Sequence, residues 1–251
     1  METVIELAKM IDHSLLHPTM TDTDLYEGFE IAKEYDVASV CVKPYAIMMA
    51  KSKLSNTEVK VGTVIGFPHG SSTIAIKVNE AQEACNYGAE ELDMVVNIGK
   101  ALQMDWSYIH DEIGAVNKAA VENGAILKVI FENDFLPTDN LKIKLCEICN
   151  DTGVAFVKTS TGYGFTKTKE GLYSYKGATD HDLKLMRKHC SPKIEVKAAG
   201  GIRNLKDLLR VKSLGVTRVG ATATVAILNE AKNRIAGNSE MPLGQSEVEG
   251  Y

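Results

Sequence analysis

The sequence lacks the features of nucleic-acid-binding and membrane-spanning proteins. Its formal net charge is −5 over 251 residues, and it has no cluster of basic residues interleaved with aromatic ones. No uninterrupted apolar run approaches the roughly 20 residues of a membrane span. The N-terminal stretch METVIELAKMIDHSLL also lacks a basic region followed by an apolar core. We therefore expect a soluble, cytoplasmic protein with no nucleic-acid and no membrane partner.

Cysteine and histidine are scarce, and their spacing predicts no metal site. Five cysteines, an odd number in a chain without a secretion signal, predict free thiols in a reducing compartment. Cys146 and Cys149 form an isolated CxxC pair inside a predicted helix, so we interpret them as packing residues. Among the six histidines, His13 and His17 straddle a strand end and a proline instead of sharing a helix face. We therefore expect no metal and no other cofactor.

What the sequence does contain is a regular alternation of strands and helices. Eight short apolar runs alternate with helical patterns, which is typical of repeated βα units around a parallel sheet. We predict strands at 10–13, 38–42, 59–67, 91–96, 126–132, 155–160, 194–199 and 217–221. The length suits a single (β/α)8 TIM barrel of the α/β class over residues 1–236, and an open, doubly wound sheet is the alternative.

Helix ends are also marked. Several predicted helices end at a glycine, which supplies the left-handed turn before the next strand: Gly88, Gly124, Gly153 and Gly215. Capping residues mark the predicted starts: Thr21 and Asp22, Ser72, Ser107, Thr138, Thr179 or Asp180, Asn204, and Thr222 or Thr224.

Two lysines stand out because each interrupts a strand that is otherwise apolar. Lys158 follows Val157 in AFVKTSTG, and Lys197 follows Val196 in IEVKAAGG. Burial penalises the charged form of an amine, and a neutral amine is a nucleophile. If the two strands are neighbours in a barrel, both amines face one small volume. Alternatively, each lysine extends from its strand end into solvent.

Other polar residues are predicted near the C-terminal ends of strands, where barrels collect their chemistry. Asp93 lies among apolar residues in EELDMVVNIG, and a buried carboxylate calls for a partner such as a lysine across the barrel or, alternatively, a structural arginine or backbone amides. Lys128 lies earlier in its strand, so we interpret it as part of the scaffold around the site. The remaining polar residues at strand ends are Asp12, Cys41, Lys43, Asn97 and Glu132.

Nearly the whole chain resembles the deoxyribose-phosphate aldolases, class I (Schiff-base) aldolases with a (β/α)8 barrel. The resemblance runs in order through IDHSLL, SVCVKP, VIGFPHG, GAEELDMVVNIG, LKVIFE, FVKTSTGYG, VKAAGGIR and RVGATA. It implies reversible cleavage of a small sugar phosphate, 2-deoxy-D-ribose 5-phosphate, to acetaldehyde and D-glyceraldehyde 3-phosphate. We also expect a homo-oligomer, a dimer or a tetramer.

The resemblance also implies roles for individual residues. Lys158 would form the Schiff base, Asp93 would donate and accept protons, and Lys197 would tune Lys158. Asp12 resembles the acidic partner of these lysines. The positions that resemble the family's phosphate site are Gly162, Gly200, Gly201, Thr222 and Ala223. Two other functions fit the same residues: another Schiff-base enzyme, such as a transaldolase-like sugar-phosphate lyase, and a barrel that binds a phosphorylated ligand without catalysis.

The chain departs from the family pattern in two places and ends in a distinctive segment. The turn after the last strand reads Gly-Ala-Thr-Ala where relatives often carry serines, so Thr222 would supply the hydroxyl. The segment from Tyr163 to Lys176 makes a connection some ten residues longer than expected, and we predict a loop over the strand end or, alternatively, a solvated excursion. Residues 237–251 are predicted to form a mobile tail. Its last residue, Tyr251, is a candidate proton relay or simply a disordered end.

Overall fold

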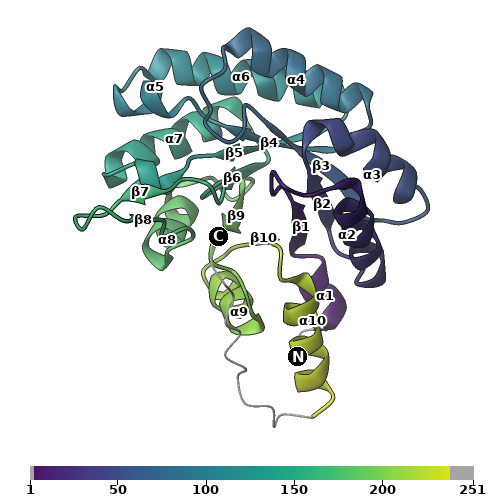
Figure 1. Cartoon of the computed structure of the whole chain (residues 1–251). Coiled ribbons are helices and arrows are strands. Elements are labelled where there is room, and N and C mark those ends of the chain that lie inside the picture. The colour runs from purple at the N-terminus through teal and green to yellow at the C-terminus, as the bar shows by residue number, and fades with distance from the viewer. Residues whose placement is uncertain (1–2, 238–251) are drawn as a thin grey trace.

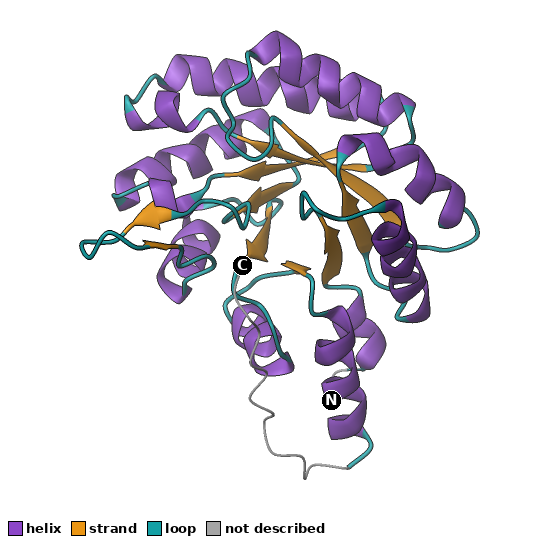
Figure 2. Cartoon of the chain, in the orientation of Figure 1, coloured by secondary structure: helices purple, strands orange, loops and turns teal. Residues whose placement is uncertain are grey.

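The computed structural model describes residues 3–237, and eight parallel strands form a closed barrel at its centre. The order around the barrel is β1, β10, β9, β6, β5, β4, β3 and β2, and β2 pairs with β1 to close the ring. Helices surround the strands, as Figures 1 and 2 show. The TIM-barrel prediction is therefore confirmed, and the open-sheet alternative is excluded because β1 also pairs with β10.

All eight predicted strands are present, with ends that differ by a few residues. The barrel strands are β1 (Ile11–Leu15), β2 (Ser39–Val42), β3 (Lys60–Ile65), β4 (Glu91–Val95), β5 (Ile126–Ile130), β6 (Phe156–Lys158), β9 (Glu195–Ala199) and β10 (Arg218–Ala221). The α helices are α1 (Val4–Ala8), α2 (Asp22–Glu34), α3 (Ile47–Lys53), α4 (Ile74–Asn86), α5 (Ile98–Leu102), α6 (Trp106–Glu122), α7 (Asp139–Thr152), α8 (Asp180–His189), α9 (Leu205–Ser213) and α10 (Thr224–Ile235). Two short 3-10 helices are η1 (Pro44–Ala46) and η2 (Asn133–Phe135).

Strand alternation separates a polar barrel interior from an apolar layer beneath the helices. On β4, Leu92 and Met94 belong to the main hydrophobic core, whereas Glu91 and Asp93 point to the other face and both approach Lys128. Successive side chains of a strand point to opposite faces, so this pattern follows directly from the sequence. The interior of the barrel therefore receives the charged residues of the strands.

Most helix termini follow the predicted chemistry, but four helix starts differ. Thr138 is the N-cap residue of α7, as predicted, but its side chain makes no capping hydrogen bond. The predicted glycines all adopt positive φ values, from 66° at Gly153 to 99° at Gly88. The predicted cap Ser72 is wrong, because the hydroxyl of Thr73 accepts the N–H of Ile76. The predicted cap Ser107 is also wrong, because α6 begins two residues earlier than that prediction required and its cap is Asp105. The cap of α10 is neither predicted threonine but Ala223, which has no side-chain acceptor.

The long connection after β6 forms a small hairpin of its own. Strand β7 (Thr166–Lys167) pairs antiparallel with β8 (Tyr173–Ser174), and the hairpin projects from the barrel near α8 in Figure 1. Its tip is exposed, with Leu172 and Tyr173 each about 70% accessible. Its base is packed, because the ring of Tyr163 contacts that of Phe67 and the ring of Phe165 contacts that of Tyr175.

Two predictions concern regions at the edge of what the structure describes. Within residues 3–237, no helix combines the length and the apolar character needed to cross a membrane. The predicted tail over residues 237–251, including Tyr251, lies outside the described residues except for Gly237.

Candidate active site

Lys158 and Lys197 end up side by side inside the barrel. They are register partners in the β6–β9 ladder, and their side chains are 3% and 1% exposed. The Nζ atom of each lies 2.7 Å from the same atom, Oδ2 of Asp93. The alternative in which the lysines extend into solvent is therefore wrong, and the predicted lysine partner of Asp93 is present, because both lysines donate hydrogen bonds to it.

A second layer of charged side chains lies beneath Lys158, Lys197 and Asp93. Asp12 Oδ2 accepts from Lys197 at 2.5 Å and from Lys128 at 2.8 Å. Lys128 also donates to Glu91 at 2.6 Å. Arg218 donates to Asp12 and, at 2.8 Å, to Glu91. Among the described residues, Lys197 thus pairs with two carboxylates and Lys128 with three, counting Asp93 at 3.5 Å, whereas Lys158 pairs with one.

The composition of this network favours one neutral amine. It contains four basic side chains and three carboxylates, all largely withdrawn from water: Lys128, Lys158, Lys197, Arg218, Asp12, Glu91 and Asp93. An unbalanced buried charge is costly, so the group with the fewest counter-charges is the one that loses its proton. That group is Lys158.

The pKa directions agree with this charge count. Burial lowers the pKa of Lys158, and the nearby charge of Lys197 adds to the effect against the opposing pull of Asp93. Burial alone would also lower the pKa of Lys197, but Asp12 and Asp93 outweigh it and raise that pKa. The three lysines hold the pKa of Asp93 below its ordinary value in spite of burial. The site therefore pairs a reactive amine with a permanent cation and an ionised carboxylate.

Two buried polar atoms on or just after the strands of the site lack a hydrogen-bond partner among the described residues. Oδ1 of Asp93 and Oγ of Ser160 are buried without a hydrogen-bond partner in the described structure, and Ser160 lies two residues after Lys158 along the strand direction. Nearby Cys41 is not a competing nucleophile, because burial, followed by the charge of Asp93, raises the pKa of its thiol to about 11. An aldehyde that reached Lys158 could form an imine there.

Three neighbouring strands deliver the predicted phosphate residues to one side of the barrel mouth. Gly162 follows β6, Gly200 and Gly201 follow β9, and Thr222 and Ala223 follow β10. The three glycines adopt φ values between 86° and 90°, and the space above Gly162 and Gly201 is open. The start of α10 has no side-chain cap, so its first N–H groups are available to an anion.

The sequence missed part of the charged network. Glu91 and Arg218 were not singled out, although Glu91 lies two residues before Asp93 and therefore shares its face. Arg218 opens the last strand between the buried Val216 and Val219, and the sequence analysis includes it only within the RVGATA motif. Lys128, interpreted as scaffold, does contact the site through Asp12, with Asp93 3.5 Å away.

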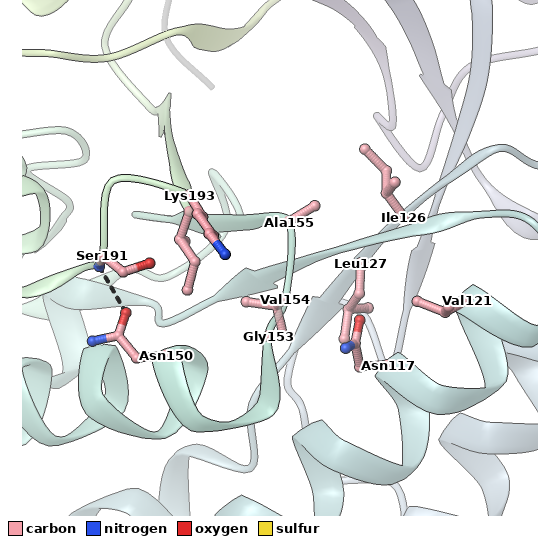
Figure 3. A pocket seen from close by; sticks show the side chains of 11 residues that line it. Asn117, Val121, Ile126, Leu127, Asn150, Gly153, Val154, Ala155, Ser191 and Lys193 are labelled. Carbon is pink, nitrogen blue, oxygen red and sulfur yellow. Dashed lines mark hydrogen bonds between the residues drawn. The ribbon is translucent and has the colours of Figure 1, made fainter.

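Two other features do not belong to this site. A hollow of about 340 Å³ lies at the opposite, N-terminal end of β5, β6 and β9, where Figure 3 shows Asn150 accepting the N–H of Ser191. Asp139, His181 and Asp182 form a group with metal-ligand spacing that the sequence did not predict. There Lys142 already pairs with Asp182 at 2.5 Å.

Comparisons with known proteins identify the family. The model of the DeoC/LacD family aldolases matches residues 6–231. The deoxyribose-phosphate aldolase of Rhodopirellula baltica is 49% identical over 230 residues, covering 92% of this chain and 91% of that protein. That of Caldanaerobacter subterraneus is 44% identical over 237 residues, covering 94% and 98%.

A solved structure agrees with these relatives. The tetrameric deoxyribose phosphate aldolase of Aeropyrum pernix superposes with a TM-score of 0.81 at 28% identity, covering 92% of this chain and 93% of that one. Together with the barrel and its buried lysine pair, these matches show that the chain belongs to the DeoC/LacD family of aldolases.

Proposed function

We propose that this protein is a deoxyribose-phosphate aldolase, a lyase that reversibly cleaves 2-deoxy-D-ribose 5-phosphate to D-glyceraldehyde 3-phosphate and acetaldehyde. The observation that carries the proposal is the placement of Lys158, buried in register with Lys197 and bonded to the same oxygen of Asp93. The names of the curated relatives supply the substrate.

The reaction begins at Lys158. Its neutral amine adds to the aldehyde carbon of the open-chain sugar, and loss of water from the carbinolamine gives an iminium. Removal of the proton from the C3 hydroxyl then breaks the C2–C3 bond. C3 leaves as the aldehyde carbon of D-glyceraldehyde 3-phosphate, and the electron pair of the broken bond moves into the iminium to form an enamine. Protonation of the enamine carbon and hydrolysis release acetaldehyde and return the amine.

Asp93 and Lys197 have separate duties in these steps. Asp93, acting through a water molecule, moves protons during dehydration, hydroxyl deprotonation and enamine protonation, and its charge stabilises the iminium. Lys197 stays cationic and keeps the pKa of Lys158 low. Asp12 holds Lys197 and Lys128 in place.

The substrate phosphate is held at the glycine turns and the start of α10. Gly162, Gly200 and Gly201 let the backbone approach the anion closely, and the N–H groups beyond Thr222 and Ala223 face it with a favourable helix dipole. Three features support this placement: the left-handed glycines, the open space above two of them, and the uncapped helix start.

Tyr251 is proposed as a relay for the proton that the enamine takes up. Its phenol is suited to general acid–base work. The test replaces Tyr251 with Phe and follows exchange of the acetaldehyde methyl protons with deuterated water. Exchange as fast as in the parent protein would remove Tyr251 from the mechanism.

The remaining proposals concern conditions and assembly. The iminium acts as the electron sink that a metal supplies in other aldolases, so we propose metal-independent activity in the cytoplasm by a homo-oligomer, a dimer or a tetramer. The tetrameric relative from Aeropyrum pernix supports an oligomer. Activity should survive dialysis against a chelator, and light scattering should give a mass above that of the 27.3 kDa chain.

A substrate panel tests the activity itself. Cleavage of 2-deoxyribose 5-phosphate is expected, together with its synthesis from acetaldehyde and glyceraldehyde 3-phosphate. Cleavage of a ketose phosphate with transfer of a three-carbon unit would instead indicate a transaldolase-like enzyme. Binding of the sugar phosphates with no turnover of any of them would indicate a barrel that only binds its ligand.

A further inference from the structure

Two carboxylates that immediately follow β5 hold the two ends of the long connection after β6. Glu132 contacts the start of that connection at Thr161, and Asp134 contacts its end at Lys176 and Gly177. Only one residue separates the two acids in sequence, and the connection between their contacts contains the β7–β8 hairpin. A short segment therefore determines where both ends of this loop lie.

Glu132 is held in an unusual conformation for this contact. It is 1% exposed and adopts a left-handed backbone with φ 57°, which costs energy for a residue other than glycine. Both its carboxylate oxygens accept the N–H of Thr161, at 3.2 and 3.3 Å, and Oε2 also accepts the hydroxyl. Burial raises the pKa of Glu132, whereas the bonds from Thr161 oppose that shift.

The contact between Glu132 and Thr161 extends into the glycine turn. The hydroxyl oxygen of Thr161 accepts the N–H of Tyr163 at 2.9 Å, so Gly162 lies inside a hydrogen-bonded turn anchored on Glu132. The chain then passes directly over the carboxylate, because a Cβ at Gly164 would lie 2.5 Å from Cδ of Glu132. Only glycine allows this approach.

Asp134 holds the far end of the loop, at Gly177, in an equivalent way. Its two oxygens accept the N–H of Lys176 at 2.7 Å and that of Gly177 at 3.0 Å. Gly177 in turn packs on Gly200, where a Cβ would lie 2.6 Å from the Gly200 carbonyl oxygen. That same carbonyl accepts the N–H of Ala178 at 3.1 Å. The contact with Asp134 is thus transmitted to the turn after β9.

We propose that Glu132 and Asp134 are positioning residues that set the spacing between the Gly162 and Gly200 turns and thereby the affinity for the substrate phosphate. Neither carboxylate touches the phosphate. Each acts through backbone N–H groups of the loop that joins the two turns. The inference rests on the proposed function, since it needs a phosphorylated substrate held at these glycines.

Electrostatics and positioning predict opposite results when these charges are removed. Two negative charges close to an anion site disfavour the anion, so their loss on electrostatic grounds alone would strengthen phosphate binding. If their role is to hold the turns, the same loss weakens binding because the N–H groups no longer converge on one point. The sign of the change therefore separates the two effects.

The experiment compares a phosphorylated substrate with its unphosphorylated counterpart in the full-length protein. Glu132→Gln, Glu132→Ala and Asp134→Asn are assayed with 2-deoxyribose 5-phosphate and with 2-deoxyribose. Asp105→Asn is the matched control, because Asp105 also accepts a backbone N–H, in the connection between α5 and α6, but contacts neither glycine turn. Inhibition by inorganic phosphate reports binding without turnover.

We expect the KM for 2-deoxyribose 5-phosphate to rise about tenfold in Glu132→Ala and Asp134→Asn, the size of one lost hydrogen bond to a charged group. The KM should rise less in Glu132→Gln, since the amide oxygen of Gln can still accept from Thr161. Phosphate should inhibit all three more weakly. Turnover of 2-deoxyribose and borohydride trapping with acetaldehyde should stay within about twofold of the parent, as should every value for the control.

A combined variant distinguishes a shared effect from two separate ones. Because both acids act on one loop, the double variant Glu132→Ala, Asp134→Asn should raise the KM for 2-deoxyribose 5-phosphate by less than the product of the two single-variant increases. Unchanged or tighter phosphate inhibition would overturn the proposal, as would an equal loss for both substrates. A parent protein that cleaves neither substrate would instead refute the proposed function.

Discussion

Lys158 and Lys197 donate to the same oxygen of Asp93, each over 2.7 Å. Two cations cannot share one carboxylate oxygen in a buried site without mutual repulsion, so their protonation is linked. Within residues 3–237, Lys197 has a second carboxylate partner in Asp12, whereas Lys158 has none besides Asp93. This asymmetry, which depends on the strand order, supports the proposal that Lys158 is the nucleophile.

Replacing Lys158 with Leu should abolish both turnover and covalent labelling. In the parent protein, borohydride added with acetaldehyde should reduce an imine on Lys158 and on no other lysine. Peptide mapping by mass spectrometry locates the label. A label mainly on Lys197 would reverse the roles of the two amines.

Replacing Lys197 with Leu should raise the pKa of Lys158, because a neighbouring positive charge is removed while Asp93 remains. Since the neutral amine is the reactive form, the residual activity should shift to higher pH. The measurement is the pH dependence of kcat/KM. An unchanged profile with weaker phosphate inhibition would make Lys197 a phosphate ligand.

Replacing Asp93 with Asn should separate imine formation from proton transfer. The amide keeps the shape of the carboxylate but cannot take up a proton, so cleavage should fall by about 10²-fold or more. Borohydride trapping should still label Lys158. If trapping were lost in parallel with cleavage, Asp93 would act mainly by holding the lysine.

The buried pair of Lys77 and Glu112 should be important for stability. Both side chains are fully buried, and Nζ of Lys77 lies 2.7 Å from Oε1 of Glu112. Lys77 also donates to the carbonyl of Val95 at the end of β4. Lys77→Met leaves a buried carboxylate unpaired, which should cost about 3–5 kcal/mol. Urea unfolding measures the loss.

Two further variants control this measurement of Lys77 and Glu112. Adding Glu112→Leu to Lys77→Met should restore part of the loss, because it removes the unpaired charge. Lys118→Met breaks the exposed pair with Glu122 and should change stability little. An equally small effect of Lys77→Met would show that Glu112 becomes neutral at no cost.

His13 should make the fold sensitive to acid. It is 4% exposed, Nδ1 lies 2.8 Å from the hydroxyl of Thr224, and Nε2 has no partner in the described structure. Burial lowers its pKa from 6.5 to about 4. In the unfolded chain, His13 therefore becomes protonated below about pH 6.5, whereas in the folded protein it stays neutral down to about pH 4.

The stability contributed by neutral His13 is complete above pH 6.5 and is lost as the pH falls towards 4, by about 3 kcal/mol. The unfolding free energies of the parent and of His13→Gln are measured between pH 4 and pH 6.5, and their difference gives the pH-dependent contribution of His13. The same subtraction with a variant of a surface histidine, His110→Gln, is the control. A flat difference for His13 would mean that the imidazole accepts its proton in the folded state.

The sequence predicted the barrel and the reactive trio because both depend on local regularities. Strand alternation and terminal glycines identify the βα units, and a charged residue in an apolar strand identifies Lys158, Lys197 and Asp93. Glu91 could have been added by the same rule of alternation. Its partnership with Arg218 could not, because it joins residues 127 positions apart.

The contacts that Glu132 and Asp134 make with the connection after β6 could not be predicted from the sequence either, for a different reason. The positions of Glu132 and Asp134 depend on a left-handed backbone at Glu132 and on close approaches at Gly164 and Gly177. Such turns follow from packing of the finished fold rather than from any periodic pattern. The aromatic rings at the base of the loop are packed, whereas its exposed tip matches the predicted alternative of a solvated excursion.

The order of strands around the barrel has a consequence for how the enzyme is made. Strand β10 is the last to be synthesised, yet it lies between β1 and β9 and brings Arg218 to Asp12. Until it is in place, the first strand of the chain has no neighbour on that side. Synthesis of β10 therefore closes the barrel and adds Arg218 to the charged network around Lys158 at the same time. A chain terminated before β10 would carry Lys158 without that part of the network.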